Sequence, residues 1–371
     1  MQFGFTSEQE EFRSVLRRFL EDKSPPSVVR RLMETEAGWE RDSWREINQQ
    51  LGLTAVHVPE AYGGQGFGFV ELGIVLEEMG RALLCAPFFA SAVLAACAIM
   101  NAGTESQKRS LLPDLANGDT IATLAFTEPN GRWDAEGIEA TATKANGGFR
   151  LDGVKSFVVD GHTADVIVVA AKTDKGLSFF TVPGDAPELT RRPLTVIDPT
   201  RKLARLEFRG AMGELLGEEG GGAAPFARTM MQAAVCLANE MVGGAEKLRQ
   251  SALDYANLRV QFGRTIASFQ TMKHKQADML VDVELARSAA YCAAQAAAED
   301  DAELPALASL AKACASEAYM QTAIHTIQIH GGIGFTWDND THLWFKRAKS
   351  SEVFLGDPTY HRELMMRAWG V

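Results

Sequence analysis

The periodicity of hydrophobic positions changes twice along this chain. From Thr6 to about Gly118, apolar residues recur at three- and four-residue steps, which is typical of helices packed against a core. Short runs rich in β-branched and aromatic residues, separated by Gly, Asp and Asn turns, follow as far as about residue 222 and indicate strands. The helical period then returns. The pattern predicts an α+β protein with an N-terminal helical domain over residues 1–118, a middle β-domain over 119–222 and a C-terminal helical domain over 223–371.

Caps and turn residues place the individual elements. Ser7-Glu8-Gln9-Glu10 is a capping start for the first helix, and Gly52 is expected to end a helix over residues 44–51. Further helices are predicted over residues 69–81, 87–103 and 106–117. Strands are predicted over residues 120–126, 148–153, 156–159, 166–171, 177–182 and 203–208.

The C-terminal domain is expected to be organised around residues 228–285. A long buried helix ends at Arg259, a short break follows, and a second helix starts near Thr271. Glu240 interrupts the apolar stripe of the first helix just before the close-packing pair Gly243-Gly244. Later helices are predicted from Pro305 to His330 and from Thr341 to Lys349.

The charge balance limits the partners. Lysine and arginine number 37 against 48 aspartates and glutamates, which gives a formal net charge of −11 over 371 residues. Such a chain is not expected to bind nucleic acid or an anionic membrane surface as its main target. The first residues lack the pattern of a signal or transit peptide, and no apolar run approaches the length of a membrane-spanning helix. We therefore expect a cytoplasmic protein whose five cysteines are reduced packing residues without metal-like spacing.

The run after the long helix carries a specific resemblance. Arg-x-Gln-Phe-Gly-x-x-Ile-x-x-Phe-Gln-x-x-Lys-His-x-x-Ala-Asp-Met, from Arg259 to Met279, resembles the signature of acyl-CoA dehydrogenases. The order of helical, β and helical segments along the whole chain is also the order in this family. The resemblance implies an acyl-CoA dehydrogenase-like fold with a C-terminal four-helix bundle, which binds FAD and an acyl-CoA thioester.

The resemblance also implies which residues contact FAD. In the family, the arginine at the position of Arg259 reaches the diphosphate of FAD bound to a neighbouring subunit, and the Gln-x-x-Gly-Gly-x-Gly-Phe element that starts here at Gln328 touches the adenosine part. The planar fork of an arginine suits phosphate oxygens, although an arginine in a last helical turn also caps backbone carbonyls. The implied FAD contacts are Thr127, Phe157, Arg259, Gln261, Phe262, Gln270, Gln328, Gly331, Gly332 and Gly356.

The catalytic base of the family has no counterpart at its usual positions. Dehydrogenation of an acyl thioester needs a carboxylate that removes the α-proton. The family carries it in a Tyr-Glu-Gly-Thr run, where this chain has Leu355, or early in the long helix, where it has Ala233. Glu240 is the candidate base, on the same helix face as Ala233 but about 10 Å along the axis, and Asp357 is a second candidate. Alternatively, Glu240 is a buried carboxylate that pairs with an arginine and fixes helix packing.

The expected flavin site also departs from the family. Phe126-Thr127-Glu128-Pro129 matches a Val-Thr-Glu-Pro strand, but Trp133 stands where the following loop has a serine. Phe157-Val158-Val159 stands where the family has Trp-Ile-Thr. Phe157 can still stack on a flavin, whereas Val159 has no group that donates a hydrogen bond to it.

These departures favour a subunit that completes the FAD site of an unlike partner chain. The chain resembles subunits of the heterotetrameric acyl-CoA dehydrogenases of steroid-degrading bacteria. We therefore expect FAD-dependent α,β-dehydrogenation of a bulky or steroid-derived acyl-CoA, with electron-transfer flavoprotein or a similar acceptor reoxidising the flavin. Two alternatives stay open: a self-sufficient homotetrameric dehydrogenase that uses Glu240 as its base, and a non-catalytic scaffold that binds CoA or a partner.

Overall fold

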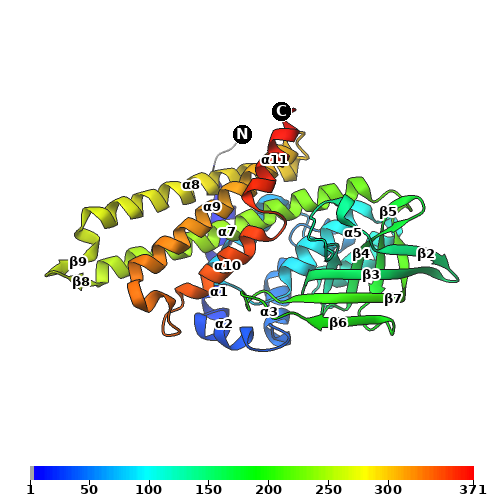
Figure 1. The fold of residues 1–371 in the computed structure, drawn as a ribbon, viewed down its shortest axis with the longest axis horizontal. Coiled ribbons are helices and arrows are strands. Elements are labelled where there is room, and N and C mark those ends of the chain that lie inside the picture. Colours follow the sequence, from blue (N-terminus) through cyan, green and yellow to red (C-terminus); the bar gives the residue numbers. More distant parts are fainter. Residues whose placement is uncertain (1–3) are drawn as a thin grey trace. The chain divides into compact units, whose positions relative to one another are not determined.

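The computed structural model of the chain describes residues 4–371, which form two compact units (Figure 1). We call them the helical unit, which comprises residues 4–30, 69–84 and 234–371, and the barrel unit, which comprises residues 31–68 and 85–233. Each unit combines segments that are far apart in the sequence. The domain boundaries near residues 118 and 222 stay a prediction.

The helical unit is made of helices joined by short turns. Its helices are α1 (Ser7–Lys23), α4 (Phe69–Ala82), the larger part of α7 (Ala223–Leu258), α8 (Gln270–Glu299), α9 (Leu304–His330), α10 (Thr341–Val353) and α11 (Pro358–Ala368). A hairpin of β8 (Val260–Gln261) and β9 (Arg264–Thr265) and the 3-10 turn η5 (Ile266–Ser268) connect α7 to α8, and the 3-10 turn η6 (Gly331–Phe335) follows α9. Figure 1 shows this hairpin at the far end of α7 and α8.

Glycines bring the helices of this unit into backbone contact. A Cβ on Gly80 of α4 would lie 1.9 Å from the Glu240 carbonyl oxygen, and a Cβ on Gly243 of α7 would lie 1.7 Å from the Glu77 carbonyl oxygen. A Cβ on Gly244 would lie 2.4 Å from the Tyr319 ring of α9. Because any larger residue would push these helices apart, the predicted close-packing role of Gly243-Gly244 is confirmed.

The barrel unit contains a closed sheet. Within residues 4–371 this sheet has seven strands: β1 (Ala122–Ala125), β2 (Thr141–Ala145), β3 (Gly148–Val159), β4 (Val166–Thr173), β5 (Gly176–Pro183), β6 (Leu189–Pro193) and β7 (Leu203–Leu216). The pairings β4–β2, β2–β3, β3–β7, β7–β5 and β5–β4 form a closed ring. β1 lies parallel to β4, and β6 lies antiparallel to β7. β-Branched and aromatic side chains of β4 and β5 are buried, as the strand pattern predicts.

The barrel unit also contains helices and short helical turns. They are α3 (Arg41–Leu51), the π-helix η3 (Phe89–Ala95), α5 (Ala96–Ala102) and α6 (Glu105–Ala116), with 3-10 turns η1 (Leu53–Ala55), η2 (Glu60–Tyr62) and η4 (Ala135–Gly137). α2 (Pro26–Met33) spans the boundary between the units.

The predicted fold class is confirmed, with helices on both sides of a β-barrel along the chain. The predicted capping start at Ser7 is one residue too late: Thr6 is the N-cap of α1, and its side chain accepts a hydrogen bond from Gln9 N. Gly52 ends α3 with φ 60°, as predicted. The pattern missed α2, β2, β6 and α11. The strands predicted over residues 148–153 and 156–159 are one strand, β3, because an irregularity near Phe157 interrupts the pairing without ending the strand.

Membrane insertion has no support in the described helices. Across residues 4–371, every helix is either too short or too polar to span a bilayer.

Candidate functional site

The hairpin after α7 has a strained tip. Gln261 pairs with Arg264, and the two residues between them, Phe262 and Gly263, have φ values of 53° and 75°. Positive φ at both central residues is the requirement of a type I′ turn, which suits Gly but strains a residue with a bulky side chain. The base of the hairpin is closed by a hydrogen bond of 2.8 Å from Ile266 N to Arg259 O. The turn therefore fixes Phe262 at the tip despite the strain.

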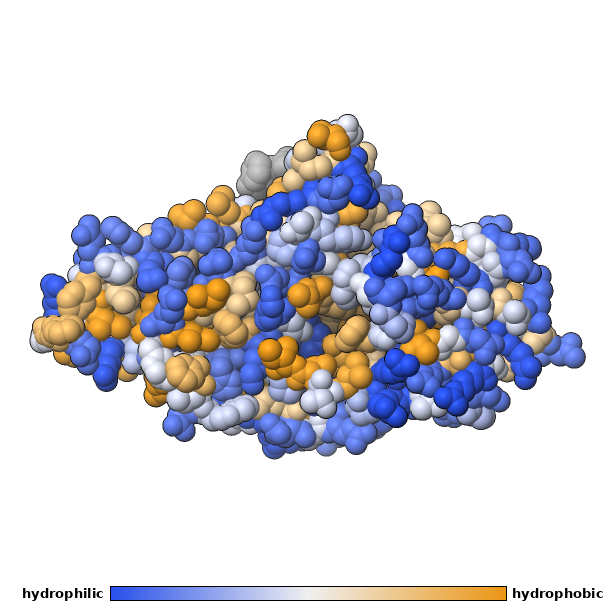
Figure 2. Space-filling model, viewed as in Figure 1, coloured by the Kyte–Doolittle hydropathy of each residue, from blue (hydrophilic) through white to orange (hydrophobic). Residues whose placement is uncertain are grey.

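Phe262 projects into solvent with 91% of its surface exposed, beside Leu258 at 81% and Val260 at 54%. Figure 2 shows hydrophobic surface at this end of the molecule, surrounded by hydrophilic residues. A cluster of exposed apolar side chains on a strained turn is typical of a surface that contacts another molecule.

Four further predicted FAD contacts of the helical unit, Gln270, Gln328, Gly331 and Gly332, are also exposed, whereas Gly356 is buried. Gln270 begins α8, and Gln328 lies in the last turn of α9, where its Oε1 accepts a hydrogen bond of 3.3 Å from Lys275 Nζ. Gly331 ends α9 with φ 68°, and a Cβ on Gly331 or Gly332 would meet no atom within 4 Å. Open space beside a glycine backbone lets a ligand approach the main chain closely.

His330 belongs to the core rather than to this exposed surface. Its ring stacks on Tyr255 with a centroid separation of 4.3 Å, and Nδ1 lies 2.9 Å from Thr326 O. Burial lowers the pKa of His330. His330 is therefore a packed histidine.

The predicted ring contacts lie in the barrel unit. Phe157 occupies the irregular part of β3 with φ 55° and is 48% exposed, so its ring face is accessible for stacking. Thr127 is buried after β1, and its carbonyl oxygen accepts a hydrogen bond of 2.7 Å from Ser156 N. Val159 is only 2% exposed and is paired with Leu203. Trp133 packs near Phe126, with ring centroids 6.1 Å apart.

A buried ion pair that the sequence did not predict supports this part of the barrel unit. Lys155 Nζ lies 2.6 Å from Glu128 Oε1, and the side chains are 0% and 3% exposed. Glu128 Oε1 also accepts a hydrogen bond of 2.9 Å from Ala140 N. Burial lowers the pKa of Lys155 to about 8, against the opposing pull of the Glu128 carboxylate. The pair ties β3 to the segment that carries Thr127.

Glu240 lies in the middle of α7, where it is nearly inaccessible to solvent. Its Oε1 accepts a hydrogen bond of 2.9 Å from Arg347 Nη1 on α10, and the two side chains are 8% and 5% exposed. Trp344, one turn before Arg347, donates a hydrogen bond of 3.3 Å from Nε1 to Gly80 O on α4. Glu240 therefore contributes to the packing of α4, α7 and α10. Its role as a base stays a prediction, and this pairing favours the structural alternative.

The loop at Leu355 is held from two sides. Leu355 is buried with φ 63°, and its carbonyl oxygen accepts a hydrogen bond of 3.0 Å from His361 Nε2. Lys312, which is fully buried on α9, donates hydrogen bonds from Nζ to Gly356 O at 3.0 Å and Glu352 O at 3.2 Å. Because Lys312 engages the Gly356 carbonyl, a cofactor contact of Gly356 stays a prediction.

The role of Asp357 as a base stays a prediction, and Ala233 has no group that could act as one. Asp357 caps α11, where its Oδ1 accepts a hydrogen bond of 2.8 Å from Tyr360 N. Ala233 is fully buried in α7 and carries no titratable group.

The residues of the helical unit fit one end of FAD. The Arg259 guanidinium forms no ion pair or hydrogen bond with another residue in the described range 4–371. An exposed guanidinium suits a diphosphate, and Gly331 and Gly332 leave space beside the main chain. The barrel unit fits the flavin ring less completely, since Phe157 can stack but Val159 cannot donate a hydrogen bond.

Comparisons with known proteins cover the whole length of the chain. The family models for the acyl-CoA dehydrogenase N-terminal, middle and C-terminal domains match residues 6–119, 123–210 and 220–370. The acyl-CoA dehydrogenase IpdE2 of Mycobacterium tuberculosis is 32% identical, over 97% of this chain and 96% of its own length.

Two solved structures show the same fold. Butyryl-CoA dehydrogenase of Megasphaera elsdenii is 28% identical with a TM-score of 0.93, and the match covers 100% of both chains. The Tcur3481–Tcur3483 steroid acyl-CoA dehydrogenase is 29% identical with a TM-score of 0.87, and the match covers 98% of both chains.

Proposed function

Because the chain belongs to the acyl-CoA dehydrogenase family, whose members use FAD, we propose that it forms one subunit of a heteromeric enzyme. The proposed reaction is the α,β-dehydrogenation of a bulky, steroid-derived acyl-CoA to the enoyl-CoA. When bound, FAD supplies the two-electron acceptor for this reaction. The residues of this chain bind and orient FAD, and an unlike partner subunit supplies the base that removes the α-proton.

The pairing of Glu240 with Arg347 is the observation that carries this proposal. A base must reach the α-proton of a substrate, within about 3 Å or through one water. Glu240 Oε1 is instead engaged by Arg347 at 2.9 Å in a buried position. Leu355 and Ala233 carry no carboxylate. The proton-accepting group is therefore expected on the partner.

The exposed surface of the helical unit supports a contribution to the partner's cofactor. Arg259 is expected to bind the diphosphate of FAD, with Gln261, Phe262 and Gln270 beside it. Gln328, Gly331 and Gly332 are expected to contact the adenosine part. Exposed Phe262 and Val260 would be covered by the partner subunit, which would offset the strain at Phe262. A strained apolar tip is easier to explain at an interface than in solvent.

The residues of the barrel unit support a weakened flavin site of its own. Thr127 and Phe157 remain at positions expected to face the ring, but Val159 is buried and has no donor. A chain with these residues is expected to bind flavin weakly through its own barrel unit.

The proposed substrate class follows one of the solved relatives. One solved relative is named as a steroid acyl-CoA dehydrogenase, and its name joins two proteins, Tcur3481 and Tcur3483. Another solved relative is a butyryl-CoA dehydrogenase. The catalytic relatives of the family act on acyl-CoA and transfer electrons to electron-transfer flavoprotein. The same acceptor is proposed here.

An anaerobic titration tests the reaction and its substrate together. The chain is purified with its co-expressed partner, and flavin absorbance is followed while acyl-CoA thioesters of increasing bulk are added. Bleaching by a steroid side-chain thioester and none by butyryl-CoA would support the proposal. Bleaching by butyryl-CoA alone would contradict the substrate class, and no bleaching with any thioester would contradict the activity.

A further inference from the structure

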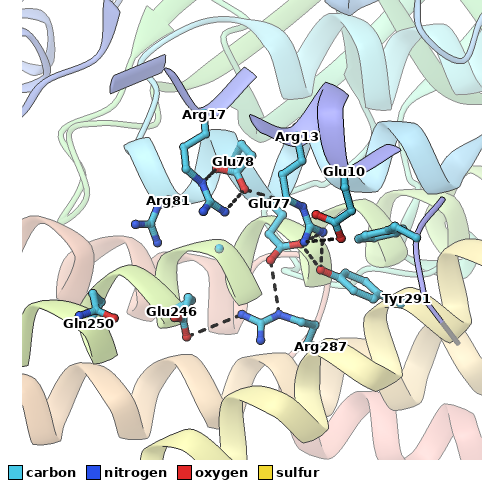
Figure 3. Close-up of a pocket in the computed structure, with 13 residues that line it drawn as sticks. Glu10, Arg13, Arg17, Glu77, Glu78, Arg81, Glu246, Gln250, Arg287 and Tyr291 are labelled. Atoms are coloured by element: carbon cyan, nitrogen blue, oxygen red, sulfur yellow. Dashed lines mark hydrogen bonds and ion pairs between the residues drawn. The ribbon is translucent and has the colours of Figure 1, made fainter. Parts of the chain in front are cut away.

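The helical unit encloses a charged cavity of about 510 Å3 among α1, α4, α7 and α8 (Figure 3). Small-molecule sites commonly have volumes of roughly 300–1,000 Å3. Arginine and glutamate side chains from all four helices line the cavity, so a polar occupant is required. None of the residues expected to contact FAD or to act as a base lines it.

The carboxylates of the cavity are already neutralised by arginines. Glu78 accepts hydrogen bonds from Arg17 Nε at 2.9 Å and from Arg17 Nη2 at 2.6 Å. Glu77 Oε2 accepts a hydrogen bond of 3.1 Å from Arg13 Nη2, and its Oε1 lies 3.5 Å from Arg287 Nε. These two glutamates therefore offer little uncompensated charge to a cation.

Glu246 is compensated in the same way. It accepts hydrogen bonds from Arg249 Nε at 2.8 Å and from Arg249 Nη2 at 2.7 Å, and its Oε2 lies 3.6 Å from Arg287 Nη2. Figure 3 shows the interactions of Glu246, Glu77 and Glu78 within the cavity as dashed lines.

Arg81 is the exception to this pairing. Within the described residues 4–371, its guanidinium makes no ion pair and no hydrogen bond, and Figure 3 shows it at the cavity wall without a dashed line. Arg81 also lines a second cavity of about 120 Å3, together with Arg17 and Lys247. A half-buried guanidinium with five N–H donors and no protein acceptor is a donor set that suits an oxyanion.

Two further cationic side chains, Arg17 and Lys247, line the second cavity together with Arg81. Burial and then the charge of Arg81 lower the pKa of Lys247. Arg17 lines both cavities beside Arg81, so three cationic side chains converge where the cavities adjoin. An anion at this point would interact favourably with all three charges, and the nearby carboxylates of Glu21, Asp254 and Asp340, which act on Lys247, would oppose it in part.

We propose that this cavity binds a small-molecule oxyanion, either a phosphate or a carboxylate, with Arg81 as its principal ligand and Arg17 beside it. The anion would join the end of α4 to α1 and α7. Binding therefore stabilises the folded helical unit, by an amount that grows with the logarithm of the free ligand concentration once this exceeds the Kd. The site is separate from the proposed FAD and acyl-CoA contacts, so it does not rest on the proposed function.

Thermal unfolding at constant ionic strength tests this proposal. The protein is used in the form in which it purifies, with inorganic phosphate in one series, succinate in a second and chloride in a third. We expect Tm to rise with the logarithm of the phosphate or succinate concentration above its Kd, for one or both anions, and not to rise with chloride. The anion that raises Tm identifies the class, and equal behaviour in all three series would overturn the proposal.

Matched variants test whether Arg81 is responsible for the anion-dependent rise in Tm. Arg81→Gln should abolish the anion-dependent rise, whereas Arg45→Gln, at an exposed arginine of α3, should retain it. Arg81→Lys keeps the positive charge but loses the planar set of guanidinium N–H donors. Equilibrium dialysis of phosphate or succinate should therefore show at least about tenfold weaker binding to this variant. Each variant is compared with its own anion-free Tm, so a change in basal stability does not obscure the result. An unchanged anion response in Arg81→Gln would overturn the proposal.

Discussion

Glu240 and Arg347 form a buried ion pair, 107 residues apart in the sequence, with Glu240 Oε1 2.9 Å from Arg347 Nη1. The pair joins α7 to α10. Because α10 leads into the Leu355 loop, the pair connects the packing of Glu240 to that loop.

Breaking this pair is expected to destabilise the protein more than removing it entirely. Glu240→Met or Arg347→Met leaves one buried charge without its partner and should lower the free energy of unfolding by about 3–5 kcal/mol. The double variant should be more stable than either single variant, because replacing both charges by apolar groups is often neutral. Denaturant unfolding of the four proteins measures this coupling. Additive losses would contradict the paired role.

Glu240→Gln separates the structural role from a catalytic one. In the co-expressed enzyme we expect flavin bleaching by acyl-CoA to persist within about tenfold of the wild-type rate, the loss coming from weakened packing. Stopped-flow absorbance measures this rate. A correctly folded Glu240→Gln protein that binds acyl-CoA but no longer bleaches would identify Glu240 as the base.

Lys312 is expected to be essential for the loop that follows α10. Lys312→Met leaves the carbonyl oxygens of Gly356 and Glu352 without their buried donor, at about 1–3 kcal/mol for each. Lys349→Met is the matched control, because Lys349 is 51% exposed and pairs with Glu352 in the same helix. The control should change stability by about 0.5 kcal/mol or less. Equal losses in the free energy of unfolding of both variants, measured by denaturant unfolding, would contradict this role of Lys312.

His361 should make stability fall in mild acid. Burial, and then the nearby Lys312 charge, lower the pKa of His361 from 6.5 to about 4. Between these values the unfolded state binds a proton that the folded state does not, so stability is complete above pH 6.5 and falls as the pH drops towards 4.

Unfolding curves across this pH range check the assignment. His361→Gln should flatten the pH dependence, with a difference of at most about 3 kcal/mol. His274→Gln, at an exposed histidine of α8, should leave the dependence as in the wild type. A slope that His361→Gln does not change would assign the acid sensitivity to other groups.

Arg259 is expected to control cofactor content. Arg259→Gln should reduce the FAD retained by the co-expressed enzyme, because it removes a charged donor worth about 1.5–3 kcal/mol. Arg264→Gln in the same hairpin is the control, since the Arg264 guanidinium lies over the Phe269 ring at 4.1 Å. Flavin absorbance per protein, measured after desalting, distinguishes them. Equal flavin content in both variants would contradict the assignment.

Local patterns in the sequence predicted the elements that depend on local signals. The period of apolar residues predicted the long helix through Glu240, and Gly52 predicted the end of α3. The predicted capping start at Ser7 was within one residue of the observed N-cap, Thr6. The run from Arg259 predicted the break between α7 and α8. It did not predict that Phe262 adopts φ 53°, because Phe is rarely found at that position of a tight turn.

Pairings between distant residues were not predictable. Glu240 was expected to pair with an arginine as one alternative, but no local signal distinguished Arg347 from the other arginines. Lys312 is part of an alanine-rich helical pattern and was not identified as buried, because its acceptors lie 40 and 44 residues later. Such contacts depend on how α9, α10 and α11 pack, which periodicity does not specify.

Flavin content of the chain alone and with an unlike acyl-CoA dehydrogenase subunit tests the heteromeric proposal most directly. Visible absorbance and native mass are measured for both preparations. We predict that the lone chain is nearly colourless and that the co-expressed complex carries about one flavin per pair of unlike chains. A lone chain that retains FAD, and whose flavin is bleached by acyl-CoA unless Glu240 is changed to Gln, would contradict it and identify a self-sufficient enzyme.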